Sequence, residues 1–287
     1  METITKLSPL ALFYIMFSLG LQCRIYDFKK VVKNPKNLII GLFSQMIVVP
    51  IIGLLIAYFA PVSLNYKIGI VLITCVPSTV TSNYLTKIIN GNVYLSITMT
   101  VICSLLSFIS IPLILTKIAP SLGLMNIIKL DISFMKLSLL LFFISTAPIL
   151  LGILINTKFR NFSKSINPFL SKSSMVVFVA VIFLAWYGDF EMSLKAYKEL
   201  FWVLIMLISL VLIYINILVI TLKIDAKDRK TIITETFIQN GAMAILVGSQ
   251  IFELGNGYLF MAAIYGLFQY KLFLVWYLID KKINKVV

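Results

Sequence analysis

The chain reads Thr231-Ile-Ile-Thr-Glu-Thr-Phe-Ile-Gln-Asn-Gly-Ala-Met-Ala-Ile-Leu-Val-Gly248 in a segment that is apolar enough to cross a bilayer but contains a carboxylate, Glu235. A carboxylate at membrane depth costs roughly 2.5–3.5 kcal/mol on insertion scales, so it normally faces a cavity or a partner. Neighbouring side chains supply oxygen atoms: Thr234, Thr236, Gln239 and Asn240. Because the chain has no histidine, this pattern predicts a cation site.

The composition is that of a membrane protein. Of the 287 residues, 60% are hydrophobic and 13% are charged, and the mean hydropathy is +1.02. These values predict an all-α protein that crosses the membrane several times. The net charge of +14 does not indicate nucleic-acid binding, because the apolar segments leave no soluble basic domain.

Apolar segments separated by charged or Pro/Asn-rich breaks predict nine membrane spans in one transmembrane domain, 1–287. Each is near the 17–25 residues that a spanning helix needs. The predicted spans are roughly 8–23, 37–60, 68–89, 93–116, 134–156, 173–189, 200–222, 230–252 and 258–279.

The positive charges predict the orientation. Most of the 25 Lys and Arg residues fall in segments that lie on one side if the N-terminus is outside and the C-terminus is inside. Cytoplasmic loops are enriched in Lys and Arg, so we expect this orientation in the plasma membrane.

Spans 68–89 and 230–252 carry polar groups at membrane depth. In the first, Pro77 removes a backbone donor and clashes with the preceding turn, and hydroxyl and amide side chains follow it as far as Thr86. Irregular backbone survives in a membrane only where protein or a watery cavity satisfies it. Two interrupted spans, one in each half of the chain, indicate a transporter site between inverted repeats. In the alternative interpretation, Ser and Thr bond to their own helices and Pro77 only kinks one.

At these residues the chain resembles the bile acid:sodium symporter family, and the resemblance covers nearly the whole sequence. It is carried by the following segments: Ile15 to Leu21 with Asp27-Phe28, Asn34 to Gly41, Gln45 with Pro50, Pro77 to Asn83, Gly91 to Thr100, and Glu235 to Asn240. The resemblance implies a panel domain, a core domain in which two broken helices cross, and two sodium sites in the core. It also implies a nine-helix form, in which the first helix of the commonly ten-helix bacterial members is not represented.

Carried over to this chain, the family pattern implies two sets of sodium ligands. The first set is Ser82, Asn83, Ser96, Thr100 and Glu235. The second set is Gln45, Glu235 and Gln239 with the backbone carbonyls of Thr236 and Ile238. Glu235 alone supplies negative charge, so a bridging Glu235 would couple the two sites. Taken singly, Gln45 or the Ser96–Thr100 pair is as simply explained by helix packing.

Two departures from the family pattern concern the substrate. Ser78 and Thr79 stand where the family often has paired glycines, which narrows the crossing point and favours a substrate smaller than a bile acid. The last span carries Gln269 and Lys271, which together with Asn240 are the candidate substrate residues. Lys271 has two interpretations: a ligand for a substrate carboxylate or internal partner, or a lysine that snorkels to the interface.

The sequence therefore favours a sodium-coupled secondary transporter of a small organic anion, working by alternating access with Na⁺ as the coupling ion. Half-helix N-termini would favour an anionic group. One alternative is a proton-coupled carrier of the same fold, and another is a non-transporting regulator of ion homeostasis. An enzyme is not favoured, because no nucleophile–base pair or metal cluster is apparent. The oligomeric state is not indicated.

Overall fold

Helices form every regular element in the part of the chain that the structure describes. The computed structural model describes residues 2–33, 35–124, 133–187, 190–251 and 258–283. Six helices are long and apolar enough to cross a membrane, and a seventh span is a pair bent by 60°, Leu64–Cys75 (α5) with Val80–Ile88 (α6). The expected all-α, multi-pass membrane fold is confirmed.

Described helices occur in each predicted range; in the first, Pro9–Gln22 is a shorter apolar helix, and in the eighth the chain forms two helices, Ala226–Phe237 (α13) and Gly241–Ile251 (α14), so the total of nine spans stays a prediction. The end of the sixth predicted span (188–189) and the last residue of the eighth (252) lie outside the described residues. The elements not yet given have these bounds: α1 Glu2–Gln22, α2 Ile25–Lys33, α3 Pro35–Phe43, α4 Val49–Phe59, α7 Val93–Leu113, α8 Ala119–Ser121, α9 Phe134–Leu141, α10 Ala147–Lys158, α11 Arg160–Tyr187, α12 Phe190–Thr221 and α15 Tyr258–Ile283.

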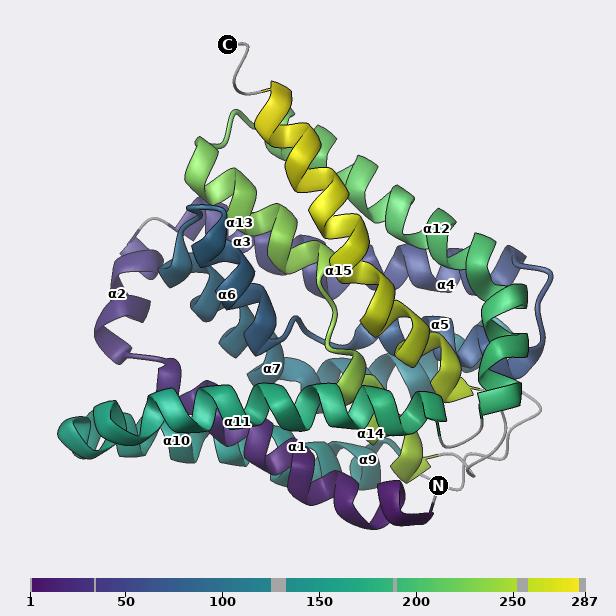
Figure 1. Cartoon of the computed structure of the whole chain (residues 1–287), viewed down its shortest axis with the longest axis horizontal. Helices are drawn as coiled ribbons and strands as arrows, with labels where there is room; N and C mark the ends of the chain where they lie inside the picture. Colours follow the sequence, from purple (N-terminus) through teal and green to yellow (C-terminus); the bar gives the residue numbers. More distant parts are fainter. Residues whose placement is uncertain (1, 34, 125–132, 188–189, 252–257, 284–287) are drawn as a thin grey trace.

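The helices form two groups. We call α1, α9, α10 and α11 the panel group and α3 to α7 with α12 to α15 the core group; in Figure 1, α1, α10 and α11 lie together along the bottom, and α14 of the core group lies among them, in contact with α1 and α11. Inside the panel group, α1 and α10 approach closely at two glycines. A Cβ at Gly20 would collide with the carbonyl oxygen of Ile149, and one at Gly152 with the carbonyl oxygen of Phe17. Small residues at such crossings let membrane helices pack without a hydrophobic driving force.

Two helix pairs in the core group are interrupted, and their breaks meet. Val76, just before Pro77, has extended backbone (φ −78°, ψ 150°), as expected of a residue before proline. Ile238, after α13, is also extended (φ −83°, ψ 112°). The backbone N–H of Asn240 donates to the carbonyl of Pro77 at 2.9 Å. This contact joins the two predicted breaks at one crossing point.

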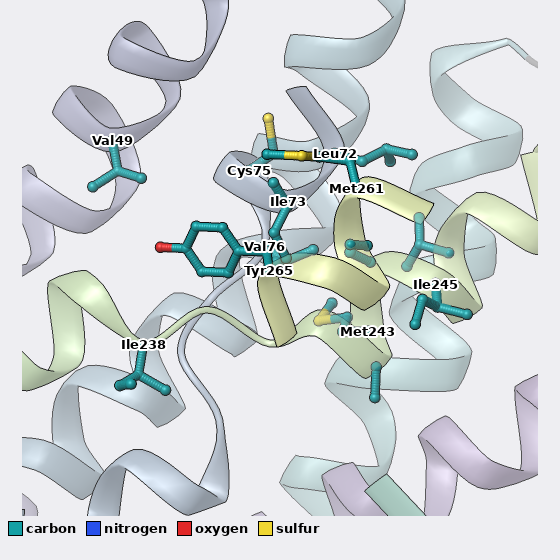
Figure 2. Packing of buried hydrophobic residues seen from close by; sticks show 14 of the residues in the cluster. Val49, Leu72, Ile73, Cys75, Val76, Ile238, Met243, Ile245, Met261 and Tyr265 are labelled. Carbon is teal, nitrogen blue, oxygen red and sulfur yellow. The ribbon is translucent and has the colours of Figure 1, made fainter. Parts of the chain in front are cut away.

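Two side chains from α15 complete the crossing. Gln269 accepts from the Gln239 N–H at 2.8 Å and donates to the Gln239 carbonyl at 3.1 Å. The Tyr265 hydroxyl donates to the Phe237 carbonyl at 2.9 Å. Figure 2 shows apolar side chains, including Val76 and Ile238, around this region. The unwound backbone is therefore satisfied by protein groups, as membrane depth requires.

Prolines also explain three π-helical stretches, Ser44–Val48, Ile114–Ile118 and Phe142–Thr146. Each ends two residues before a proline: Pro50, Pro120 or Pro148. Proline cannot donate the usual helical hydrogen bond and clashes with the turn before it, so the helix locally widens.

Two helices begin well before their predicted spans, and one predicted connection is helical. Helix α11 begins at Arg160 rather than 173, and α12 begins at Phe190 rather than 200. Hydropathy detects the apolar part of a helix, whereas the helix itself continues into polar residues that satisfy their backbone internally. Helix α2, Ile25–Lys33, was expected as a loop, but its sequence is strongly amphipathic. Amphipathic helices of this kind lie in the membrane interface.

Candidate functional site: a carboxylate–hydroxyl cluster at the helix crossing

The Glu235 side chain is completely buried near the end of α13 and contacts four hydroxyl groups. Ser82 and Ser96 donate to its Oε1 at 2.6 and 2.5 Å. Thr100 donates to its Oε2 at 2.7 Å, and Ser78 donates to the same oxygen. Such charge-assisted bonds are about twice as strong as neutral ones.

Three elements supply these partners. Ser78 lies in the α5–α6 break, Ser82 lies on α6, and Ser96 and Thr100 lie one turn apart on one face of α7. The cluster therefore ties α13 to the α5–α6 break, to α6 and to α7.

Asn83 completes the predicted first set. Its Oδ1 lies 2.7 Å from Ser96 Oγ, whose single proton goes either to it or to Glu235, and 3.4 Å from Thr100 Oγ1. Its Nδ2 is buried and has no partner among the described residues. The structure thus brings all five predicted residues together and adds Ser78.

The donor chemistry fits a small hard cation. The cluster offers hydroxyl, amide and carboxylate oxygens with one formal charge, and oxygen ligands are what hard cations take. No group of three or more His, Cys, Asp or Glu side chains that could hold a metal ion occurs in the described part of the chain. The cluster therefore suits a monovalent cation better than a transition metal.

The second predicted set is only partly assembled. Gln45 Nε2 donates to Gln239 Oε1 at 2.7 Å and to the Val76 carbonyl at 3.2 Å. Gln239 Nε2 donates to the Thr236 carbonyl at 2.9 Å. Within the described residues, Glu235 has no hydrogen bond to Gln45 or Gln239. Because α13 ends at Phe237, Gln239 leaves the helical face that would place it one turn from Glu235.

The predicted substrate residues do not converge on one place. Asn240 Oδ1 accepts from the Met243 N–H at 2.9 Å, which caps α14, and Gln269 bonds the Gln239 backbone. Both are buried. Lys271 is exposed, with its Nζ 5.1 Å from the centroid of the Phe268 ring. The structure therefore separates Lys271 from the cluster and gives Gln269 a structural role in the break.

Sequence reasoning missed two contacts. Ser78 was counted among the polar side chains after Pro77 and as a departure from glycine, but not as a partner of Glu235, although a hydroxyl at membrane depth needs a partner. Thr81 Oγ1 and the Tyr270 hydroxyl lie 2.8 Å apart and join α6 to α15. The pairing depends on how the two helices cross, which spacing along the chain does not give.

A further polar cluster positions the start of α13. Asn37 Nδ2 donates to Asp228 Oδ2 at 2.6 Å, and Asn92 Nδ2 donates to Asp228 Oδ1 at 2.7 Å. The Asn92 N–H donates to Thr231 Oγ1 at 2.7 Å. These contacts hold the start of α13 against α3 and against Asn92, the N-cap of α7. They thereby help to set the position of Glu235, which lies further along the same helix.

Comparison with known proteins agrees with this geometry. Residues 9–196 match the model of the sodium bile acid symporter family. The chain is 26% identical over 240 residues to the "Uncharacterized sodium-dependent transporter YocS" of Bacillus subtilis, covering 83% of this chain and 72% of that protein.

Chloroplast proteins of rice are also similar. The "Probable sodium/metabolite cotransporter BASS2, chloroplastic" is 30% identical over 162 residues, covering 56% of this chain and 37% of that protein. For the corresponding BASS1 protein, 26% identity extends over 245 residues, or 83% of this chain and 57% of that protein. The chain thus spans less than two thirds of these two plant relatives.

Proposed function

This chain belongs to the sodium bile acid symporter family, and from that premise we propose that it couples the movement of sodium to that of a small organic anion by alternating access. The family consists of transporters rather than enzymes. The observation that carries the sodium proposal is the buried Glu235 with its four hydroxyl partners and Asn83.

The cluster would bind sodium as cargo. A hydroxyl has one proton and two lone pairs, so rotation of Ser82, Ser96 and Thr100 turns donors to the carboxylate into ligands for a cation. Glu235 would supply the compensating charge, and Asn83 Oδ1 a neutral ligand. Gln45, Gln239 and the carbonyls of Thr236 and Ile238 remain the proposed second site.

Binding at this position would bias the conformation of the core group. The ligands come from α6, α7, α13 and the break between α5 and α6. A cation that attracts all of them favours the arrangement in which they converge, and a ligand shifts an equilibrium only through such differential contacts. The core group would then move against the panel group, with the N-terminus outside and the C-terminus inside the plasma membrane.

A proton-coupled carrier is the alternative on the same fold. A protonated Glu235 would need only one acceptor, whereas four hydroxyls point at its two oxygens. Four donors favour the ionised carboxylate, which supports a metal cation as the coupling ion.

Uptake into vesicles tests the proposal. Purified protein is reconstituted, and accumulation of labelled pyruvate, lactate, succinate and 2-oxoglutarate is followed under an inward sodium, potassium or proton gradient. We expect accumulation of at least one anion under the sodium gradient only, and its loss in Glu235→Gln.

The matched control is Glu199→Gln, which neutralises an exposed carboxylate on α12 and should leave uptake intact. Accumulation driven by the proton gradient without sodium would show that the coupling ion is the proton rather than sodium. If the Glu235→Gln variant takes up the anion as well as the unchanged protein does, Glu235 is not part of the coupling site.

A further inference from the structure

A polar pocket of about 200 Å³ lies where the link from α1 to α2 meets the turn from α10 to α11. Figure 1 shows both segments at the same end of the molecule, the link in purple and the turn in teal. Each segment contributes three residues to the lining, which consists of Arg24, Ile25, Tyr26, Asn156, Thr157 and Arg160. The pocket is thus built by segments that are distant in sequence.

Hydrogen bonds at the end of α1 hold one side of this pocket in place. The buried side chain of Asn156 donates from Nδ2 to the Cys23 carbonyl at 2.9 Å. Asn167 Nδ2 donates to the Leu21 carbonyl at 3.4 Å. These amides satisfy carbonyls that the end of a helix leaves without a partner. The backbone that carries Arg24 is therefore fixed against α10 and α11 before any ligand arrives, which lowers the cost of binding.

The charged side chains of the lining are both arginines. Only three of the 25 Lys and Arg residues in the chain are Arg, and two of them, Arg24 and Arg160, line this pocket. None of its lining residues in the described part of the chain is acidic. A guanidinium group is a planar fork that can bond two phosphate oxygens at once, whereas an ammonium group acts as a point charge. Tyr26 and Thr157 add hydroxyl donors, so the lining has the chemistry of a phosphate site.

Helix dipoles and the orientation rule do not account for this lining. Helices α2 and α11 begin beside the pocket, but α1 and α10 end beside it, so the partial charges of the helix ends offset one another. The orientation rule explains an excess of basic residues at this end of the helices, but it does not favour arginine over lysine. The two arginine side chains are therefore the groups that would recognise an anion.

Exposed apolar side chains flank the pocket on both sides. Ile25 and Tyr26 are exposed at the start of α2, and Phe159 and Phe162 are exposed at the turn between α10 and α11. Helix α2 is amphipathic and its sequence contains three lysines and one aspartate. Apolar and basic side chains on an amphipathic helix are typical of the headgroup level of a membrane. A ligand at this depth would meet cations at its phosphate and apolar side chains beside it.

We propose that this pocket binds the phosphate of an anionic phospholipid. Arg24 and Arg160 bond the phosphate oxygens, Tyr26 and Thr157 donate their hydroxyl protons, and the acyl chains lie beside Phe159. Basic pockets between membrane helices on the cytoplasmic side commonly take such headgroups. Because α2 also contacts α3 and α7, the lipid holds the turn of the panel group to the helix that leads into the core group. The inference does not rest on the sodium site.

Lipid titration of the purified protein tests the inference. Lipid-depleted protein in detergent is titrated with phosphatidylglycerol or phosphatidylcholine of the same acyl chains, and binding is followed by native mass spectrometry and thermal unfolding. Potassium replaces sodium throughout, so the result is independent of the sodium proposal. Both lipids have a phosphate, but only phosphatidylglycerol has a net negative charge, since the choline cation would lie against the arginines. We expect phosphatidylglycerol to bind about tenfold more tightly.

Arg160 is the residue to vary, because Arg24 also lines a larger cavity of about 290 Å³ between the two helix groups. Arg160→Gln should weaken phosphatidylglycerol about tenfold. Arg160→Lys keeps the charge and loses the fork, so its affinity should lie between those of Arg160→Gln and the unchanged protein. Lys172→Gln is the matched control, since Lys172 is exposed further along α11 and does not line the pocket. It should leave the affinity unchanged.

Three results would overturn the inference. They are equal affinities of the unchanged protein for the two lipids, equal effects of Arg160→Gln and Lys172→Gln, and full affinity in Arg160→Lys, which would show attraction by net charge alone. Inorganic phosphate is a separate arm of the titration. If it binds as tightly as phosphatidylglycerol, the ligand is a soluble phosphate and the lipid assignment is wrong. Arg160 is exposed, so the lipid-free variants should unfold at the temperature of the unchanged protein, and the comparison of the two lipids needs no variant.

Discussion

Glu235 retains its hydrogen bonds at full burial because the hydroxyl donors around it come from segments that the fold brings to one point. Ser82 and Ser96 serve one oxygen, and Ser78 and Thr100 serve the other. The carboxylate is thus solvated by protein rather than by water. A site built in this way can hold a charge at membrane depth and still exchange a cation.

Ser78→Ala tests whether that solvation stabilises the protein. The substitution removes one charge-assisted hydrogen bond, so we expect the free energy of unfolding without sodium to fall by about 1.5–3 kcal/mol. Thermal unfolding in detergent measures the change. Ser104→Ala is the matched control, since the Ser104 hydroxyl is buried on α7 without a partner among the described residues. Equal stability of the two variants would show that Ser78 does not support the carboxylate.

At this scale the lone carboxylate in an apolar span indicated that Glu235 needs polar partners, and the family resemblance named Ser82, Asn83, Ser96 and Thr100, which the structure brings to it together with Ser78. The sequence did not predict that Glu235 is separate from Gln45 and Gln239, since that depends on where α13 unwinds. Lys271 shows the same limit. The sequence showed that Lys271 lies deep in a predicted span. It did not show that the Lys271 side chain is exposed and lies over the Phe268 ring.

At the scale of elements, the crossing of the two broken helices depends on α15. Gln269 satisfies both the N–H and the carbonyl of Gln239, and Gln239 in turn contacts Gln45. Two side chains of this neighbouring helix, Gln269 and Tyr265, consequently satisfy backbone groups of the break. The exposed backbone of a broken helix is stable in a membrane only with such support.

Gln269→Leu should therefore destabilise the protein strongly. It keeps the volume but leaves the buried Gln239 N–H unpaired, at about 1–3 kcal/mol, while the Gln239 carbonyl keeps only the Gly241 N–H at 3.0 Å. Lys271→Met, two residues away on the exposed side, should cost less than about 1 kcal/mol, the value of an exposed cation–π contact. Thermal unfolding of the two variants separates the predictions, and similar losses would contradict the role given to Gln269.

The breaks themselves were predictable, because Pro77 and the polar run after Glu235 interrupt apolar segments. The starts of α11 and α12 were not, since hydropathy detects the membrane-facing part of a helix and not its polar extension. Each π-helical stretch ends two residues before a proline, so the sequence marks where a helix is disturbed. Whether the helix widens there depends on the packing around it.

On the scale of the whole molecule, the Glu235 cluster lies inside the core group, whereas a cavity of about 290 Å³ lined from α6 and α11 lies between the core and panel groups. Composition and spacing predicted the membrane fold, but this division became visible only from the packing of helices distant in sequence.

The most direct test of the sodium site is a cation titration of the purified protein by thermal unfolding. Selective binding stabilises the folded state by RT ln(1 + [L]/Kd), about 2.7 kcal/mol at a hundredfold excess over Kd. We predict that sodium raises the melting temperature, that potassium at equal ionic strength does not, and that Glu235→Gln abolishes the difference while Glu199→Gln preserves it. Equal melting shifts in sodium and potassium, or an undiminished sodium shift in Glu235→Gln, would contradict the assignment of the Glu235 cluster as a sodium site.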